Sequence, residues 1–287
     1  WEDGDGCTMS AFRKHTGIEL WKTEYIFSES KIITPEGSSF SFIGMTYAPD
    51  FEGENEAVLY SVDALTGGYK LKVAFWSGEE MYRPKKIYRF GTHYIIDADA
   101  VDYRHITAIN AESGLVRWEL ELDKDPFLRS RAVDIVWSDS LVIIPLEEEL
   151  QAYDVYSGTM HWSYDYTDDI DGIGYLNQSG VGGETISFLS DDNEFVSLNI
   201  KTPQISYKEN VAFDDAVRVQ YLDSTYILGY NNGGYISLFK KNATDVKNVW
   251  TRDVGTIESL ILSQKNIHVF SPDNYYTINF KNGEVSE

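Results

Sequence analysis

The sequence predicts an all-β fold, a β-propeller of seven blades with four antiparallel strands each, and it leaves eight blades open as an alternative. Three observations lead to this prediction. A short phrase recurs along the chain, each copy lies among strand-like apolar runs, and no convincing amphipathic helix separates the copies. A repeat of about 40 residues that holds several short strands is typical of propeller blades. We therefore expect residues 1–287 to form a single propeller domain.

The recurring phrase consists of alternating apolar and polar residues, a Thr-Gly or Ser-Gly step, and a Trp four residues after the glycine. Its clearest copies span residues 8–21, 107–118 and 151–162. Seven copies, counted from the glycine position or its equivalent, lie 38 to 50 residues apart. The repeat residues that we expect to shape the blades are Gly17, Trp21, Gly67, Gly114, Trp118, Gly158, Trp162, Trp250 and Gly283.

Four of the seven copies are weaker and keep only part of the phrase. The copy at Gly67 has no Trp after its glycine. Another carries Pro203 where the glycine is expected, and Tyr207 takes the Trp place. A third reaches Trp250 after a short insertion, and the last is cut short soon after Gly283. The pattern still covers nearly the whole chain, so the fold is an array of similar units.

Two strand-like runs rich in β-branched and aromatic residues belong to each unit. The first runs are residues 94–96, 141–144, 185–189, 226–230 and 266–270, and the second are residues 106–110, 150–155, 195–200 and 235–239. Tight links rich in Asn, Asp and Gly separate them, which indicates hairpin turns. Three longer links, residues 28–56, 77–92 and 119–135, read as the most irregular parts, and irregular loops on a rigid scaffold often carry function.

Four of the seven tryptophans stand at the fixed place in the phrase. A large ring that recurs at one place in a blade suits a wedge between packed sheets. We expect these rings to serve core packing rather than ligand binding.

The chain is strongly acidic, with 46 acidic against 24 basic residues and a net charge of −22. This charge disfavours nucleic acids and anionic membranes as partners, and no apolar stretch is long enough to span a membrane. The acidic clusters are either solvated loops or a negative face that steers a basic partner. They lie at residues 52–56, 147–149, 168–171, 191–192 and 214–215.

One segment departs from the acidic character of the chain. Between the second and third copies, basic and aromatic residues alternate. This segment either contacts a partner or offsets nearby acids such as Glu79 and Glu80. The residues that we expect at a partner contact are Tyr82, Arg83, Lys85, Lys86, Tyr88 and Arg89.

The sequence carries no recognisable catalytic or metal-binding pattern. The five histidines are scattered without a close ligand spacing. Cys7 is the only cysteine, which excludes an intramolecular disulfide and a cysteine-rich zinc site. Asp3 and Asp5 begin like a calcium loop, but Lys14 stands where such a loop needs its final Glu. No nucleophile elbow and no phosphate-binding loop that opens a helix is present. We therefore expect no catalytic residue, no cofactor and no metal.

The phrase resembles the PQQ-like, quinoprotein-type propeller repeat, in which an apolar strand is followed by Asp or Asn, Thr-Gly and then Trp. The dehydrogenases of that family are longer and use calcium and commonly an adjacent cysteine pair, which this chain lacks. It is more similar to the non-catalytic members, such as the propeller lipoprotein of outer-membrane barrel assembly. Cys7 has no apolar run before it, so no lipid-attachment signal is recognisable. Fold alone does not determine function.

The resemblance implies a non-catalytic propeller that binds another protein as a scaffold or adaptor. Two alternatives remain open: an acidic immunity protein that neutralises a basic toxin or nuclease, and a PQQ-dependent dehydrogenase. We expect a protein partner, with a basic one among the candidates, no nucleic acid, no membrane span and a monomeric chain. The resemblance favours an extracytoplasmic location, whereas the residues themselves leave the cytoplasm open.

Overall fold

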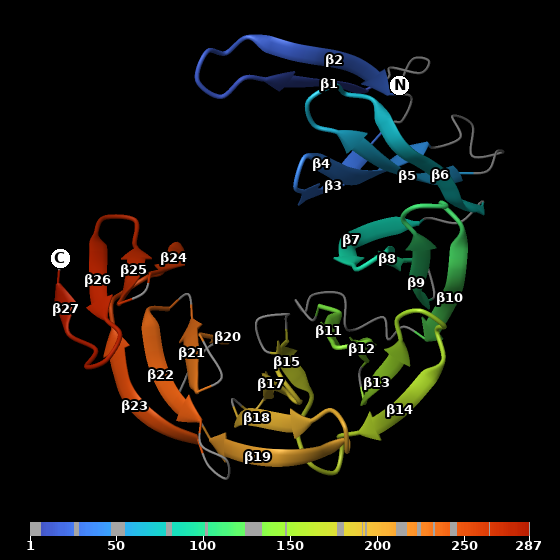
Figure 1. Ribbon diagram of the computed structural model, residues 1–287. Coiled ribbons are helices and arrows are strands. Elements are labelled where there is room, and N and C mark those ends of the chain that lie inside the picture. The colour runs from blue at the N-terminus through green and yellow to red at the C-terminus, as the bar shows by residue number, and fades with distance from the viewer. Residues whose placement is uncertain are drawn as a thin grey trace. The chain divides into compact units, whose positions relative to one another are not determined.

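The computed structural model of the protein consists of β-strands and turns (Figure 1). Its contacts divide the chain into two compact units. The first unit consists of Trp1–Pro126 and Val155–Thr159, and the second consists of Phe127–Asp154 and Met160–Glu287. No helix in the described part of the chain has the length and apolar character needed to cross a membrane. The residues that the structure describes are 7–25, 29–46, 55–78, 82–100, 103–123, 134–146, 148–176, 181–190, 192, 194–210, 217–222, 225–231, 233–241, 246–263 and 265–286.

The first unit holds three antiparallel sheets in which strands that follow each other in sequence pair side by side. The first sheet is a two-stranded hairpin, and the other two sheets have four strands each in the orders β3-β4-β5-β6 and β10-β9-β8-β7. The strands are β1 (Cys7–Phe12), β2 (Glu19–Tyr25), β3 (Glu29–Glu36), β4 (Ser39–Thr46), β5 (Asn55–Asp63), β6 (Tyr69–Gly78), β7 (Arg83–Phe90), β8 (His93–Asp99), β9 (Tyr103–Asn110) and β10 (Val116–Asp123).

The second unit holds four antiparallel sheets of the same meander type. Three have four strands, and in the remaining sheet β15 and β16 both pair with β17. The strands are β11 (Val136–Ser138), β12 (Leu141–Pro145), β13 (Glu149–Asp154), β14 (Met160–Asp165), β15 (Ile173–Tyr175), β16 (Val181–Gly182), β17 (Thr185–Ser190), β18 (Glu194–Asn199), β19 (Gln204–Asn210), β20 (Val217–Tyr221), β21 (Tyr226–Asn231), β22 (Tyr235–Lys241), β23 (Val246–Asp253), β24 (Ser259–Leu262), β25 (Asn266–Phe270), β26 (Tyr275–Asn279) and β27 (Val285–Ser286).

Each of the seven sheets corresponds to one copy of the phrase, which fills both strands of the first sheet and the last two strands of the others. The paired runs predicted from the sequence are confirmed, for example at β8 with β9 and at β17 with β18. The prediction of irregular links was wrong where the structure describes them. Residues 29–36, 39–46 and 83–90 are strands, and most of residues 119–123 belongs to β10. Residues 47–54, 79–81 and 124–133 of these links lie outside the described residues.

A β-bulge recurs at the same place in the last strand pair of six sheets. In the pair β9–β10, Val116 faces Ile109 and Trp118 faces Ala108, so Arg117 is the extra residue. The extra residue comes directly before the Trp position in each of these pairs. Because a bulge re-aims the side chains that follow it, it sets the direction of the Trp ring.

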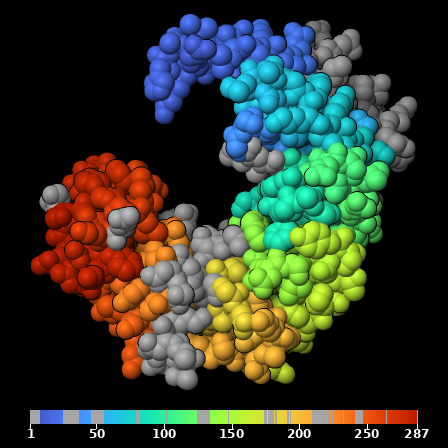
Figure 2. All heavy atoms as spheres, viewed as in Figure 1, coloured from blue at the N-terminus to red at the C-terminus, as the bar shows by residue number. Residues whose placement is uncertain are grey.

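Apolar residues between neighbouring sheets form the core of each unit. In the first unit, Ile43, Leu59 and Phe75 of one sheet pack with Ile96 and Ile109 of the next. Figure 2 shows the light-blue β3–β6 sheet packed directly against the green β7–β10 sheet. In the second unit, one core lies between the sheets of β12 and β18 and another between those of β22 and β25. The sheets are therefore held face to face.

Candidate interaction surface

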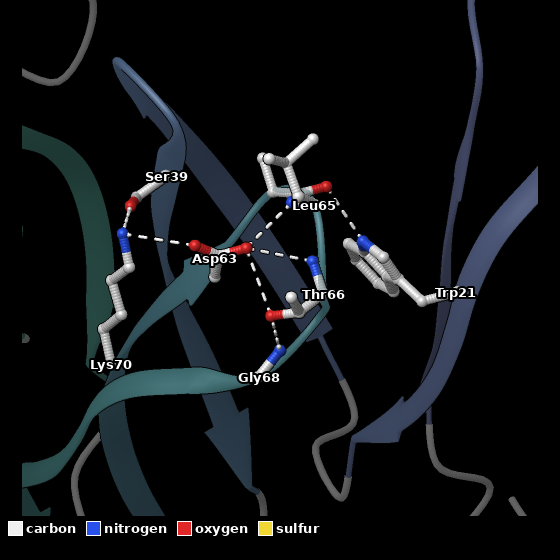
Figure 3. Close-up of polar contacts among 8 residues, drawn as sticks. Trp21, Ser39, Asp63, Leu65, Thr66, Gly68 and Lys70 are labelled. Atoms are coloured by element: carbon white, nitrogen blue, oxygen red, sulfur yellow. Dashed lines mark hydrogen bonds and ion pairs between the residues drawn. The ribbon is translucent and has the colours of Figure 1, made fainter.

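In four of the four- and five-stranded sheets, the turn after the β5, β9, β18 or β26 strand contains an Asp or Asn side chain that accepts hydrogen bonds from the turn, as Asp63 does in Figure 3. In the second sheet, Oδ1 of Asp63 accepts hydrogen bonds from the backbone N–H groups of Leu65 and Thr66, at 3.0 and 2.9 Å, and from the Thr66 hydroxyl at 3.1 Å. These bonds, those from the Thr66 and Leu65 amides above all, lower the pKa of Asp63. Oδ2 of Asp63 lies 3.4 Å from Nζ of Lys70. The carboxylate thus organises the whole turn.

The same turn recurs with an amide in place of the carboxylate. In the third sheet, Oδ1 of Asn110 accepts bonds from the N–H groups of Glu112 and Ser113 and from the Ser113 hydroxyl, at 2.8 to 3.1 Å. The N–H of Gly114 then donates to the carbonyl of Asn110 at 2.8 Å. This explains the Asp or Asn that stands three residues before Thr or Ser in several copies of the phrase, whereas Arg13 takes this place in the first copy.

The Trp of one sheet packs onto this turn in the following sheet, as Trp21 does in Figure 3. Its indole N–H donates to the carbonyl of Ala64 at 2.9 Å, and a Cβ added at Gly67 would lie 2.6 Å from Cδ2 of the ring. The contact recurs between Trp118 and the turn at Gly158, where the indole donates to the carbonyl of Val155 at 2.9 Å. The glycine is therefore needed both for its positive φ and for the space that the ring occupies.

The weak copies of the phrase change this contact in ways that the structure explains. Leu71 stands at the Trp place of the second sheet, and the turn at Gly114 packs on Leu71 and Val73 instead of an indole. In the fourth sheet, the buried indole nitrogen of Trp162 has no hydrogen-bond partner in the described part of the chain. The turn that follows carries Pro203 in place of glycine. Because proline cannot adopt a positive φ, residue 203 cannot take the left-handed backbone conformation that glycine has in the other turns.

The residues proposed from the sequence as partner contacts lie on or next to β7, the edge strand of its sheet, and they divide into two groups. Arg83, Lys85 and Lys86 are exposed. Tyr82 is fully buried and Tyr88 is 7% exposed, while Arg89 is half-buried. The two tyrosines therefore belong to the core of the chain, and the exposed part of the segment is basic only.

Two of the exposed cations of β7 interact with other residues of the chain. Nζ of Lys85 lies 2.9 Å from Oδ1 of Asp99 on β8, and Nζ of Lys86 lies 5.7 Å from the centre of the Tyr88 ring. The same sheet holds a buried ion pair that sequence reasoning missed. Nε and Nη2 of Arg104 donate to the two carboxylate oxygens of Asp97, at 2.9 and 2.8 Å. Such paired geometry satisfies a buried charge.

A buried histidine lies beside Tyr82. Nδ1 of His105 is 3.3 Å from the hydroxyl of Tyr82 and 3.3 Å from that of Thr107. Its Nε2 lies 3.8 Å from a carboxylate oxygen of Glu119 on the neighbouring strand. Burial lowers the pKa of His105 and raises that of Tyr82. This cluster packs against Trp76 and holds the Tyr82 ring in place.

Chemically reactive side chains come together at one further place, which sequence reasoning also missed. Nδ1 of His268 lies 2.5 Å from the hydroxyl of Tyr275, and its Nε2 lies 3.2 Å from Oγ of Ser263. The Ser263 hydroxyl donates to the carbonyl of Asn266 at 2.9 Å, and the cluster is open to solvent. Among the described residues, no group of three or more His, Cys, Asp or Glu side chains is arranged to hold a metal ion.

The chain resembles known proteins along nearly its entire length. A family model described as outer membrane protein assembly factor BamB matches residues 8–286. The chain belongs to this family. The predicted PQQ-like repeat is thereby confirmed. No curated protein matches the chain significantly.

Two solved structures share the BamB-like fold of the chain. BamB from Moraxella catarrhalis is 14% identical with a TM-score of 0.62, and the alignment covers 99% of this chain and 84% of that one. The computationally designed Ika8 protein is 11% identical with a TM-score of 0.55, and the alignment covers 98% of this chain and 90% of that one. At such identities these likenesses establish the fold, and the predicted β-propeller class is confirmed.

Proposed function

We propose that the chain is a non-catalytic β-propeller that binds another protein as a scaffold or adaptor. The observation that carries the proposal is the match to the BamB family over residues 8–286. The name of that family refers to outer membrane protein assembly, so we extend to this chain a role in protein recognition and an extracytoplasmic location. We further propose that residues 1–287 form a single propeller domain and act as a monomer.

The sequence and structure support this proposal through the role of the repeat residues. Trp21, Trp118 and Trp250 each donate their indole N–H to a turn carbonyl of the following sheet. The turn glycines leave room for these rings. The distinctive residues of the phrase therefore build the scaffold, and recognition falls to the side chains that the scaffold displays.

The exposed cations of β7 are our first candidates for partner contact. Arg83, Lys85 and Lys86 present positive charge on a chain whose net charge is −22. Such a local reversal of charge favours an acidic segment of the partner. Replacing Lys85 and Lys86 by Glu should weaken binding if they contact the partner, whereas replacing the exposed Lys201 of the second unit serves as the matched control.

A specific observation also favours a second function, the neutralisation of a basic toxin or nuclease. The net charge of −22 would attract a cationic partner over long distances and accelerate association. Such binding would weaken steeply as the salt concentration rises.

The proposal is tested by capturing partners from the source cell extract on the immobilised chain at low and moderate salt, followed by mass spectrometry. We expect one partner that is retained at both salt concentrations and that binds the purified chain in a titration. Capture of a basic protein only at low salt would favour neutralisation. Dye reduction by the chain with pyrroloquinoline quinone and calcium, without any captured protein, would contradict the proposal and favour the dehydrogenase.

A further inference from the structure

A serine, a histidine and a tyrosine meet in the last sheet of the second unit, and they belong neither to a core nor to the partner contacts proposed above. His268 lies on β25, Tyr275 lies on the neighbouring strand β26, and Ser263 follows the end of β24. Figure 1 shows these three strands side by side near the C-terminus. The three residues are called the Ser263 cluster below. A hydroxyl beside an imidazole is the arrangement that activates a nucleophile.

The histidine of the cluster lies between two hydroxyl groups. Its Nδ1 is 2.5 Å from the Tyr275 hydroxyl and its Nε2 is 3.2 Å from Oγ of Ser263. The Tyr275 oxygen also accepts a hydrogen bond from the Thr277 hydroxyl at 3.2 Å, so it is placed as an acceptor for a proton on Nδ1. This assigns the proton of the neutral imidazole to Nδ1 and leaves the lone pair of Nε2 directed at Ser263.

Aromatic rings hold the histidine in this orientation. The rings of His268 and Tyr275 are nearly parallel, with an interplanar angle of 8° and centroids 5.9 Å apart. Phe270 lies against the same tyrosine, with ring centroids 5.1 Å apart. The base is therefore oriented before any ligand arrives, which lowers the entropy cost of the reaction.

The Ser263 hydroxyl is placed to give its proton to Nε2 of His268. Oγ accepts a hydrogen bond from the N–H of Asn266 at 3.2 Å, and the hydroxyl donates to the Asn266 carbonyl at 2.9 Å. That carbonyl also accepts the backbone N–H of Ser263 at 2.9 Å, so the turn keeps this bond when the hydroxyl rotates toward the histidine. The Asn266 N–H then stabilises the negative charge that develops on Oγ.

The fold does not require a histidine at this position. His268 pairs with Thr277, which stands six residues before the turn glycine Gly283. In four other sheets the residue of the equivalent pair is Ser or Ile and is buried. These residues are Ser41, Ile95, Ile143 and Ser187, with exposed fractions of 0%, 2%, 0% and 0%. His268 is only half-buried, so its imidazole is open to a reactant that the other positions could not reach.

The side chains around the cluster indicate which reactant fits it. Ile261 lies directly opposite His268 on β24 and is 55% exposed, and the Tyr275 ring is 45% exposed. Both are uncharged, which favours an apolar acyl group beside the histidine. Because the cluster is open to water, the acyl donor must itself be activated, as an ester of an acidic phenol is.

From these contacts we infer that Ser263 is a site of covalent acylation by activated apolar esters, with His268 as the base and Tyr275 as the residue that positions it. Oγ of Ser263 bonds to the acyl carbon while Nε2 of His268 takes the hydroxyl proton. The bond between the acyl carbon and the leaving oxygen breaks, and the leaving group receives the proton from His268. The products are an acyl-serine ester and the free phenol.

The inference goes beyond the proposed function and does not rest on it. Partner binding needs no reactive serine, and a single modification of the chain is compatible with a non-catalytic scaffold.

The inference is tested by mixing the purified full chain with p-nitrophenyl butyrate. We expect an initial release of p-nitrophenolate equimolar with the chain, and peptide mass spectrometry should place the butyryl group on Ser263. Ser263→Ala should abolish this phase. Ser286→Ala is the matched control, because it removes another exposed hydroxyl of the same sheet, one that donates to the carbonyl of Thr277.

Two further variants test the roles of the other residues in the cluster. His268→Gln should slow acylation by about a hundredfold, the loss expected for a general base, whereas His161→Gln on β14 should leave the rate unchanged. Tyr275→Phe keeps the ring but removes the hydroxyl. It should lower the maximal rate and leave the ester concentration at half-maximal rate unchanged, since the hydroxyl orients the base and does not hold the ester. Unchanged melting temperatures would show that the variants fold.

Three outcomes would overturn the inference. They are butyryl groups on lysines alone, labelling of Ser286 as fast as that of Ser263, and a rate that His268→Gln does not lower. Capture of a partner by the immobilised chain is measured separately, so the proposed function would stand or fall on its own result.

Discussion

At the scale of single residues, the turn glycines combine two requirements that are separable in this chain. Gly158 has a φ of +70°, and a Cβ there would lie 2.6 Å from Cγ of Trp118. Gly17 adopts nearly the same φ, +65°, in the same type of turn, but has nothing within 4 Å of the added Cβ among the described residues. The two positions therefore distinguish backbone strain from the space that the ring needs.

Gly158→Ala should reduce the free energy of unfolding by about 2–4 kcal/mol, because strain in the left-handed region adds to overlap with the indole. Gly17→Ala should cost about 1–2 kcal/mol, the backbone term alone. Chemical denaturation of both variants measures the difference. Equal losses would show that the ring does not restrict the turn.

His105 makes the stability of the fold depend on pH. Burial lowers its pKa, while Glu119 and Glu121 oppose this effect. The folded chain therefore binds a proton less readily than the unfolded chain, so stability is greatest above the ordinary histidine pKa of about 6.5 and falls as the pH drops through it. His105→Gln should flatten this fall in urea titrations between about pH 7.5 and pH 5.5.

The matched control is His161→Gln, which replaces an exposed histidine of β14. It should leave the pH dependence as it is in the original chain. The variant at His105 should remove only part of the dependence, because burial lowers the pKa of His93 as well. An unchanged pH dependence in His105→Gln would contradict the assignment.

At the scale of elements, the sequence predicts the middle strands of most sheets but misses β3 and β7, the first strands of the second and third sheets. The runs at β8 and β9 are apolar and buried, so their composition identifies them. β3 and β7 contain Pro35 and Pro84, and β7 carries four cations, which hides their strand character. Both are edge strands, where proline and charge are tolerated because one side of the strand has no neighbour.

The candidate contact surface was predictable only in part for a related reason. The basic character of β7 is visible in the sequence, but a bulge between Pro84 and Lys86 interrupts the alternation of its faces. Which way the side chains of Tyr82 and Tyr88 point therefore could not be predicted from their positions in the sequence.

The contact between Trp and the following turn leads to a prediction for pairs of sheets. Trp118→Phe removes a hydrogen bond to the carbonyl of Val155, whereas the indole nitrogen of Trp162 has no such partner in the described residues. Both changes shrink a packed ring to a similar extent. Trp118→Phe should therefore cost about 1–2 kcal/mol more in unfolding free energy than Trp162→Phe. Equal costs in denaturant titrations would show that the indole hydrogen bond adds nothing.

At the scale of the whole molecule, the chain combines a net charge of −22 with the exposed cations Arg83, Lys85 and Lys86 of β7. The net charge attracts cations over long distances, whereas the β7 cations favour an acidic segment of a partner. These two features therefore predict partners of opposite charge.

The most direct test of this account is the dissociation constant of the captured partner, measured with the purified chain from about 50 to about 500 mM NaCl, a range over which exposed charges become screened. If the chain is a protein-binding scaffold, the partner captured at both salt concentrations should bind the purified chain saturably across this whole range. Absence of saturable binding to the purified chain would contradict the central claim. Binding of a basic protein that is lost as the salt concentration rises would favour neutralisation instead.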